Sequence, residues 1–445
     1  MYFPSRESTY QYFYLIKIMN RVIFHIDMNS YFASVAQHFD TELRNRPVAV
    51  MGKGKGTVVI AASKEAKKYG IKTGTHKYDA VKMCPDIVFV PPAFDKYVQT
   101  TAIILQVFHE FTPLVEPFSI DEAFLEMTNT YWICMGMHPV DVAYMIKKRM
   151  RERLGDVITC SVGIADNKLM AKFGSDLKKP DGIVFLTPDR YMDVLDHSNL
   201  QEICGIGRRT FAHLERLGIK NFRQLRDMSY IKLKKEFGPV QGKFLHLAAH
   251  GENHSRVNPS AFFNDPKSVS HAETFTENWS GVDLMSKIYK LCEKVSLRLR
   301  TKELYAGCVH IYIKDHNFKG VSFEQKLAHP TNNTIEIFHA LSQHISQNFV
   351  SRFVCIWSHD LVRERIADLF DETLKYDRLQ MSLDRINTKY GHFSILPASI
   401  KKPTDLDNPV DIPFSGLDND AKTGKDLTTL LRQRDVILHK VLHQS

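Results

Sequence analysis

Long hydrophobic runs, a signal-peptide core and cysteine pairs are all missing from this sequence of 445 residues. No apolar run reaches the roughly 18 residues that a membrane-spanning helix needs. Residues 1–20 include Arg6, Glu7 and Lys17 and contain no signal-peptide core. The seven cysteines are scattered, and they form neither a C-x-x-C pair nor a zinc-finger spacing with histidine. We therefore expect a cytoplasmic protein without a membrane span, whose cysteines are reduced thiols of the core.

The charge and the size of the chain indicate what kind of protein it is and how many domains it has. Lys and Arg together number 59 against 50 Asp and Glu, which gives a formal net charge of +9. A basic balance favours a polyanionic partner such as a nucleic acid, although many proteins that bind no polyanion are also basic. Hydrophobic residues make up 44% of the sequence. A chain of this size can bury large cores and is expected to divide into about three domains.

Short segments in the first half of the chain alternate between strand and helix patterns. Periodicity predicts strands at 21–27, 47–51, 57–61 and 158–165, helices at 30–38, 97–110 and 139–154, and a β-hairpin at 115–127. This order favours an α+β fold with one sheet. The GKGKG segment at 52–56 joins two predicted strands and lacks the spacing of a P-loop, so we interpret it as a flexible basic turn.

The rest of the chain predicts a basic helical segment, a linker and a second α+β unit. The helical segment covers 186–250, and residues 251–270 have the Pro, Asn and Ser content of a linker. Periodicity then predicts helices at 283–302 and 334–350 and strands at 307–315 and 320–327. The tail after residue 395 is poorly patterned apart from a predicted helix at 426–442. Because Met19 directly precedes the first predicted strand, we expect residues 1–18 to be a dispensable extension or the result of a misplaced start.

Two adjacent carboxylates, Asp121 and Glu122, interrupt the apolar segment VEPFSIDEAFLEM. Such a pair is usually the exposed tip of a β-hairpin. This tip contains no Gly, Asn-Gly or Pro that would make an ordinary solvated turn. Asp27 closes the earlier strand in VIFHID, and three carboxylates at the ends of neighbouring strands can hold divalent cations for phosphoryl transfer.

The segment ICGIGRRTFAHLERLGI, residues 203–219, predicts a helix-hairpin-helix. Gly205 and Gly207 would let the backbone approach a phosphate, and the following helix would present free N–H groups to it. Arg208 and Arg209 would add positive charge. An ordinary glycine-rich connection between helices is the alternative. Contacts of this kind hold a nucleic-acid backbone without reading its base sequence.

A helix predicted after the strand at 158–165 carries Lys168 and Lys172 four residues apart. If this helix lies beside the acidic hairpin, the two lysines can neutralise an incoming triphosphate. Lysines that only make the surface soluble are the alternative.

Four segments carry a resemblance to one protein family: HIDMNSYFASV, SIDEAF, SVGIADNKLMAKFGSDLKKPDG and ICGIGRRT. In this order they resemble the Y-family translesion DNA polymerases, particularly the bacterial UmuC-like branch, over residues 21–392. The resemblance implies a right-hand polymerase of the α+β class, with a ferredoxin-like palm, small fingers, a helical thumb and a separate α+β little finger. The implied boundaries are an N-terminal extension at 1–20, palm at 21–39 and 92–185, fingers at 40–91, thumb at 186–254, linker at 255–270, little finger at 271–392 and a tail at 393–445.

The resemblance also implies roles for single residues. Asp27, Asp121 and Glu122 match the catalytic acids that hold two Mg²⁺ ions, and Met28 matches the residue that supplies a backbone carbonyl ligand. Phe32 falls at the steric-gate position, where an aromatic ring excludes a ribose 2′-hydroxyl. From the sequence alone, a core aromatic after a strand is the alternative for Phe32.

Three lysines are implied to bind the triphosphate of the incoming nucleotide. Lys179 aligns with the triphosphate-binding lysine of the family. Lys64 and Lys67 stand where many members carry Tyr and Arg. Lysine lacks the bidentate fork of arginine, so we expect this pair to bind the triphosphate more loosely.

The implied activity is template-directed, low-fidelity DNA synthesis without proofreading, on primer–template DNA with deoxynucleoside triphosphates. We expect a monomer that acts at the nucleoid. The segment Ile366 to Phe370 keeps the Leu-Phe anchor of a sliding-clamp peptide but lacks its leading glutamine, so it predicts weak clamp binding or none. Two other classes stay open, namely a palm-fold nucleotidyl cyclase and a non-catalytic helix-hairpin-helix DNA-binding protein.

Overall fold

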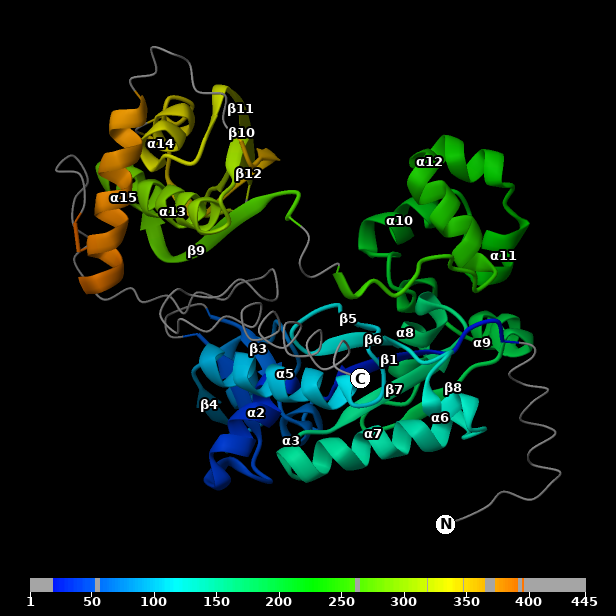
Figure 1. Cartoon of the computed structure of the whole chain (residues 1–445). Coiled ribbons are helices and arrows are strands. Elements are labelled where there is room, and N and C mark those ends of the chain that lie inside the picture. Colours follow the sequence, from blue (N-terminus) through cyan, green and yellow to red (C-terminus); the bar gives the residue numbers. More distant parts are fainter. Residues whose placement is uncertain are drawn as a thin grey trace, which may run out of the picture. The chain divides into compact units, whose positions relative to one another are not determined.

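The computed structural model describes residues 19–52, 57–260, 265–317, 319–346, 348–364, 373–390 and 394–395 (Figure 1). These residues form two compact units, one before residue 261 and one after residue 264. Several predictions lie outside the described residues: the dispensable extension at 1–18, the sliding-clamp segment at 366–370 and the helix at 426–442.

The first unit is built on a five-stranded sheet in the order β5-β6-β1-β7-β8. Its strands are β1 (Ile23–Met28), β5 (Val115–Pro117), β6 (Glu122–Glu126), β7 (Cys160–Ala165) and β8 (Ile183–Phe185). β1 is antiparallel to β6 on one side and to β7 on the other, and β8 runs parallel to β7. The predicted hairpin at 115–127 is confirmed as β5 and β6, whereas β8 was not predicted.

Helices cover both faces of this sheet. One face packs against α2 (Tyr31–Phe39), α5 (Phe94–His109) and α7 (Pro139–Leu154), and the other packs against α8 (Lys168–Leu177). Successive side chains of a strand point to opposite faces. Phe24 and Ile26 of β1 therefore enter the core with α5 and α7, while Ile23 packs toward α8. His25 and Asp27 share the face that α8 covers.

Two glycines let α8 approach the sheet closely. A Cβ atom on Gly163 of β7 would lie 1.9 Å from the carbonyl oxygen of Ala171. Gly174 of α8 lies opposite, where a Cβ atom would be 3.5 Å from the Cα atom of Gly163. A side chain at Gly163 would push the helix away from the strand. The close approach brings the lysines of α8 to the acidic hairpin.

The segment between α2 and α5 forms a sheet of its own, in the order β3-β2-β4. It contains β2 (Val48–Met51), β3 (Val59–Ala62), β4 (Val88–Val90), α3 (Lys64–Lys67) and α4 (Lys77–Met83), and a 3-10 turn at Thr41–Leu43 precedes it. The prediction of one sheet is wrong for this half of the chain. The reason is that β2 and β3 bury Ala49 and Val59 in a separate core with α3 and α4. β2 pairs with β3 in antiparallel fashion, so the GKGKG segment connects two strands as predicted. The predicted flexible turn itself falls on residues 53–56, outside the described residues.

Four helices occupy the predicted helical segment of the first unit in the part that the structure describes. They are α9 (Tyr191–Asp196), α10 (Arg208–Arg216), α11 (Phe222–Asp227) and α12 (Tyr230–Ala249), with 3-10 turns at Pro188–Arg190 and Leu200–Glu202. α12 bends at Gly238, whose φ of 79° is not helical, just before Pro239. Leu214 of α10 is buried, and Gly218 follows the helix with a φ of 81°, as the helix-hairpin-helix pattern predicts.

The second unit contains a four-stranded antiparallel sheet in the order β11-β10-β12-β9. Its elements are β9 (Val269–Trp279), α13 (Gly281–Thr301), β10 (Tyr305–Lys314), β11 (Gly320–Thr331), α14 (Thr334–Ser342), β12 (Ser351–Val362) and α15 (Thr373–Tyr390). α13 and α14 cover one face of the sheet, where Val309, Ile311 and Ile356 are buried (Figure 1).

Several elements of the second unit differ from the predictions. β9 begins at Val269, inside the predicted linker at 255–270. β9, β12 and α15 were missed. In β9 and α15, polar residues interrupt the apolar periodicity. The helix predicted at 334–350 ends at Ser342.

None of the helices among the described residues is long and apolar enough to cross a membrane. All seven cysteines are free thiols. The prediction that they belong to the core is wrong for Cys134 and Cys204, which are exposed. Cys134 ends the short surface helix α6 (Tyr131–Cys134), and Cys204 lies in the turn before α10.

Candidate active site

The strand register brings the three predicted acids together. Asp27, near the end of β1, lies directly opposite Glu122, the first residue of β6. The amide of Met28 donates a hydrogen bond to the carbonyl oxygen of Asp121 at 2.9 Å. Asp27, Asp121 and Glu122 therefore lie side by side where two neighbouring strands meet the hairpin turn.

A tight turn without glycine holds the acids at the hairpin tip. The amide of Ser119 donates to the carbonyl oxygen of Glu122 at 3.2 Å, and its hydroxyl donates to Asp121 Oδ1 at 2.5 Å. From α5, the Thr101 hydroxyl donates to the carbonyl oxygen of Ile120 at 2.7 Å. Because a packed helix anchors this turn, it needs none of the residues that usually form solvated turns.

The three carboxylates have unequal affinities for protons. Burial raises the pKa of both Asp27 and Asp121, and the nearby charge of Glu122 raises it further. Burial also opposes the charge of Glu122, but hydrogen bonds from His25 and Lys172 bring its pKa down to about 2. Buried carboxylates that repel one another favour the binding of a divalent cation. The oxygen donors present here suit a hard cation.

Two side chains hold Glu122 in place from the face that α8 covers. Lys172 forms an ion pair with Glu122, and His25 Nε2 lies 3.0 Å from Glu122 Oε2. His25 Nδ1 lies 2.8 Å from the hydroxyl of Ser175, also on α8. His25 was not predicted. A signal was present, because His25 and Asp27 are two residues apart in an otherwise apolar strand and must face the same side.

The other predicted lysine of α8 also contacts the hairpin. Lys168 Nζ donates to the two carboxylate oxygens of Glu116, on β5, at 2.6 and 2.7 Å. The amide of Asn258 donates to Glu116 Oε2 at 2.7 Å. α8 therefore lies beside the acidic hairpin, which was the condition set for Lys168 and Lys172. Both ammonium groups pair with hairpin glutamates, and their contact with a triphosphate stays a prediction.

Lys179 lies next to one of the acids. Its Nζ atom is 3.0 Å from Asp27 Oδ1 and 2.7 Å from Asp176 Oδ1. Burial lowers the pKa of the Lys67 ammonium group. The charge of Lys179 lowers this pKa further and the charge of Asp27 raises it, so Lys67 is within electrostatic range of both side chains. Lys64 Nζ lies 3.8 Å from the carboxylate of the next residue, and 65% of its side chain is exposed.

Phe32, the predicted steric gate, lies in the first turn of α2. Its ring stacks on Tyr97 of α5, with centroids 4.3 Å apart and planes inclined by 28°. Tyr97 is buried, and its backbone carbonyl accepts a hydrogen bond from the hydroxyl of Tyr31 at 2.8 Å. Phe32 is only partly buried at the edge of this core. Its position is compatible with both the gate and the packing alternative, and the supporting Tyr97 was not predicted.

The glycines of the helix-hairpin-helix differ in conformation. Gly205 has a φ of 107°, and a Cβ atom there would lie 2.5 Å from the ring of Phe244. Gly207 precedes α10 with a φ of −80°, and among the described residues no atom lies within 4 Å of where its Cβ would be. The fold therefore requires glycine at Gly205, whereas Gly207 leaves open space before the helix. Arg208 and Arg209 follow and are exposed.

Models of known families match three parts of the chain. The model of the impB/mucB/samB family matches residues 26–176, and that of the C-terminal domain of this family matches residues 266–364. The model of the DNA polymerase-iota thumb domain matches residues 201–253. The last match covers the helix-hairpin-helix.

Relatives and a solved structure agree with these matches. DNA polymerase IV of Moorella thermoacetica is 37% identical over 380 residues, which cover 82% of this chain and 92% of that protein. DNA polymerase IV 1 of Bacillus subtilis is 34% identical, over 84% of this chain and 91% of that protein. A Y-family DNA polymerase chimera of Dbh and Dpo4 has the same fold, with a TM-score of 0.66 at 22% identity over 77% of this chain and 100% of that chain. The predicted right-hand fold is confirmed, and the chain belongs to the impB/mucB/samB family, the Y family of translesion DNA polymerases.

Proposed function

We propose that Asp27, Asp121 and Glu122 are the catalytic acids of template-directed DNA synthesis and hold two Mg²⁺ ions, with the backbone carbonyl of Met28 as a further ligand. DNA polymerases of the Y family use divalent metal ions. The observation that carries the proposal is the register that sets Asp27 opposite Glu122, with Asp121 in the turn beside them. The donors are all oxygen atoms, which are the ligands that Mg²⁺ prefers.

The residues around the acids prepare the site for the reaction. When bound, the ions lower the pKa of the primer 3′-hydroxyl and offset the charge of the triphosphate. Ser119 donates to Asp121, and Lys172 with His25 keeps Glu122 ionised. These contacts orient the carboxylates of Asp121 and Glu122 toward one geometry, which favours catalysis because less reorientation is needed.

Lysines supply positive charge for the triphosphate. Lys179 Nζ lies 3.0 Å from Asp27 Oδ1, and the pKa of Lys67 responds to the charges of Lys179 and Asp27, so both lysines are candidates to contact a triphosphate held at the acids. Lys64 is mostly exposed and would have to turn inward. Lysine offers a point charge without a planar fork, which supports a looser hold on the triphosphate than arginine would give.

Phe32 is the proposed steric gate for the sugar. Its ring is stacked on the buried ring of Tyr97, so it has little freedom to move away from a 2′-hydroxyl. The clash would disfavour a ribonucleotide but leave a deoxyribonucleotide unaffected. The same packing explains why a large aromatic side chain is present at the edge of the core.

The thumb is proposed to hold primer–template DNA by its phosphate backbone. The open space at Gly207 lets a phosphate approach the first N–H groups of α10. Arg208 and Arg209 are exposed beside it and add positive charge. Contacts to phosphates alone do not read sequence, as a polymerase that copies any template requires.

Low fidelity is supported by the small fingers. The fingers helices α3 and α4 have 4 and 7 residues and accompany a three-stranded sheet. So little structure gives limited contact with the new base pair, which favours tolerance of damaged templates.

We further infer a monomer that acts on nucleoid DNA in the cytoplasm, without proofreading. Any clamp contact would depend on Ile366 to Phe370.

Primer extension by the purified chain tests the reaction. Wild type and Glu122→Ala are compared on undamaged and lesion-bearing templates with Mg²⁺. We expect the wild type to add nucleotides that the template directs, past the lesion, and Glu122→Ala to add none. A cyclic product formed from nucleotide without DNA would indicate a cyclase. DNA binding without extension by the wild type would indicate a non-catalytic protein, and either result contradicts the proposal.

A further inference from the structure

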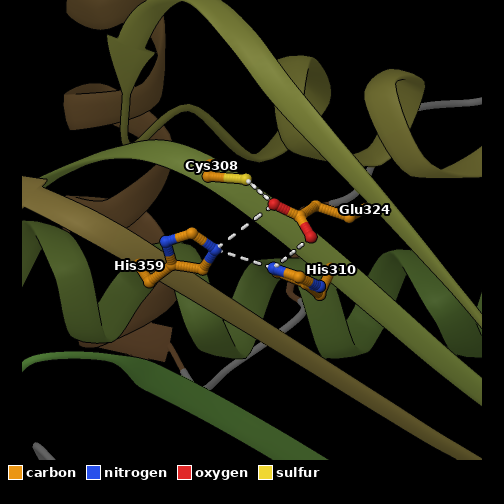
Figure 2. Close-up of side chains that lie close together, drawn as sticks. All are labelled: Cys308, His310, Glu324 and His359. Carbon is orange, nitrogen blue, oxygen red and sulfur yellow. Dashed lines mark hydrogen bonds and ion pairs between the residues drawn. The ribbon is translucent and has the colours of Figure 1, made fainter.

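A second cluster of metal-binding side chains lies on the sheet of the second unit (Figure 2). Cys308 and His310 extend from β10, Glu324 from β11 and His359 from β12. The register explains their meeting, because Glu324 lies opposite His310 and His359 lies opposite Cys308. Residues i and i+2 of a strand face the same side. All four side chains extend from one face of the sheet. The other face packs against α13 and α14 in the core.

The donor atoms have the spacing of a metal site. They lie within 4.8 Å of one another. Cys308 Sγ is 3.4 Å from Glu324 Oε1, and the Glu324 carboxylate is 3.6 Å from His310 Nε2 and 3.8 Å from His359 Nε2. The two Nε2 atoms are 2.7 Å apart. Tetrahedral zinc with bonds of about 2.0–2.3 Å places its ligand atoms about 3.3–3.6 Å apart. The three distances to Glu324 lie close to these values, whereas the two histidine nitrogens are closer together.

Other contacts orient both histidine rings toward the centre of the cluster. Asp360 Oδ1 lies 3.1 Å from His359 Nδ1. If His359 Nδ1 carries the proton and donates it to Asp360, His359 Nε2 keeps a lone pair that can bind a metal. Carboxylates orient histidine ligands in this way in many metal sites. The ring of His310 stacks on Trp357, with centroids 4.5 Å apart and planes inclined by 10°. This stacking fixes the direction of His310 Nε2.

Asp360 has a backbone conformation that is rare inside a strand. Its φ is 53°, in the left-handed region. Gly307 lies opposite, where a Cβ atom would be 3.2 Å from the Cβ of Asp360. The missing side chain at Gly307 gives Asp360 room for this conformation, in which its carboxylate lies beside His359. Strained residues of this kind often accompany functional sites.

We propose that Cys308, His310, Glu324 and His359 bind one Zn²⁺ ion that joins β11, β10 and β12. A thiolate, two imidazoles and a carboxylate favour Zn²⁺, whereas Mg²⁺ and Ca²⁺ select oxygen ligands. The proposal does not depend on the catalytic acids, which belong to the other unit. The sequence did not reveal the site, because a C-x-H pair with two distant partners matches no zinc-finger spacing.

The surroundings of the cluster allow an ion to enter and bind. The His310 side chain is only 12% exposed, but 60% of the Glu324 side chain is exposed, so the ion can reach the site from solvent past Glu324. A coordinating thiol loses its proton when zinc binds.

Zinc binding by the full chain tests the proposal. Metal is removed with a chelator, excess Mg²⁺ is added to occupy the catalytic acids, and the chain is titrated with Zn²⁺ while bound metal is counted. We expect one Zn²⁺ per wild-type chain and loss of this ion in His310→Ala and His359→Ala. His329→Ala, an exposed histidine of β11, is the matched control and should bind like the wild type. Asp360→Asn should weaken binding about 10–100-fold.

A second measurement on the wild type does not depend on how the variants fold. Co²⁺ bound in place of Zn²⁺ through a thiolate gives a charge-transfer absorption band, and Cys308→Ser should abolish this band. The proposal is overturned if the wild type binds no Zn²⁺, if its Co²⁺ form lacks the thiolate band, or if folded His310→Ala and His359→Ala keep the ion. The cluster would then be a hydrogen-bonded pair of histidines without a metal.

Discussion

Lys172 of α8 is ion-paired with Glu122 of β6, although the two lie 50 residues apart in the chain. The contact depends on how closely α8 approaches the sheet. That distance is set at Gly163 of β7, where a side chain would run into the backbone of Ala171. A proposed catalytic carboxylate is thus kept ionised by a lysine whose position requires a glycine on another strand.

Gly163→Ala should therefore weaken both the fold and the reaction. The new Cβ atom would lie 1.9 Å from the carbonyl oxygen of Ala171, and such overpacking costs about 1–3 kcal/mol or more. As α8 moves away, Lys172 should lose Glu122 and nucleotide addition should slow. Urea unfolding and single-turnover extension measure the two effects. Gly52→Ala is the control, since among the described residues its Cβ atom would meet only Thr57 Cγ2, at 3.7 Å. Equal unfolding midpoints for the two variants would contradict this account.

The two glycines of the thumb should respond differently to alanine. Gly205→Ala places a Cβ atom 2.5 Å from the Phe244 ring at a φ of 107°, so it should lower the free energy of unfolding by about 1–3 kcal/mol. Gly207→Ala should leave stability within about 0.5 kcal/mol of the wild type but weaken DNA binding, because the methyl group occupies the proposed path of a phosphate. Unfolding and fluorescence anisotropy with primer–template DNA separate the effects. Unchanged DNA affinity in Gly207→Ala would argue against phosphate binding there.

Phe32→Ala should relax the choice of sugar. We expect the ratio of ribonucleotide to deoxyribonucleotide incorporation to rise at least about tenfold, which corresponds to about 1.4 kcal/mol of lost discrimination. Steady-state kinetics with the two nucleotide types give this ratio. Phe39→Ala, at an exposed position of the same helix, should leave it unchanged. If Phe32→Ala also keeps the wild-type ratio, Phe32 is a packing residue only.

The stability of the helical segment that contains Asp196 should depend on pH. Burial slightly opposes its charge, but Arg223 and Arg226 lower the pKa of Asp196 below its usual value. A lowered folded-state pKa means that the ionised form stabilises the fold at every pH above the unfolded value of about 3.9. This stability is lost as the pH falls through the lower, folded-state pKa.

Asp196→Asn should therefore destabilise the protein by about 1 kcal/mol near neutral pH, in line with ion pairs near the surface. The difference from the wild type should vanish in acid and shrink in high salt. Urea unfolding across pH measures it. A difference that stays constant down to strongly acidic pH would show that the charge of Asp196 is not the cause.

Some parts of this fold could be predicted from the sequence, and others could not. β1 and β7 were predictable because their buried residues form short, nearly continuous apolar runs. β9 and α15 were not, since polar residues interrupt their patterns and only packing within the second unit identifies them. The single-sheet prediction failed because periodicity does not reveal which strands pair.

Some residues of the candidate site could likewise be predicted from the sequence, and others could not. Asp27, Asp121 and Glu122 could be singled out, because carboxylates in apolar strands are unusual. The partners of Glu122 depend on the approach of α8 to the sheet, which a one-dimensional pattern does not contain. The cluster around His310 and His359 depends on cross-strand register in the same way.

The central claim is that the three acids carry the chemistry. The most direct measurement is the single-turnover rate of nucleotide addition by Asp27→Asn, Asp121→Asn and Glu122→Gln, with saturating DNA and Mg²⁺. Glu152→Gln, on the surface of α7, is the control. We expect each of the three variants to slow addition at least about 1,000-fold, or about 4 kcal/mol, while DNA affinity and the control stay at wild-type values. Addition within about tenfold of the wild type by any one of the three would contradict the claim for that residue.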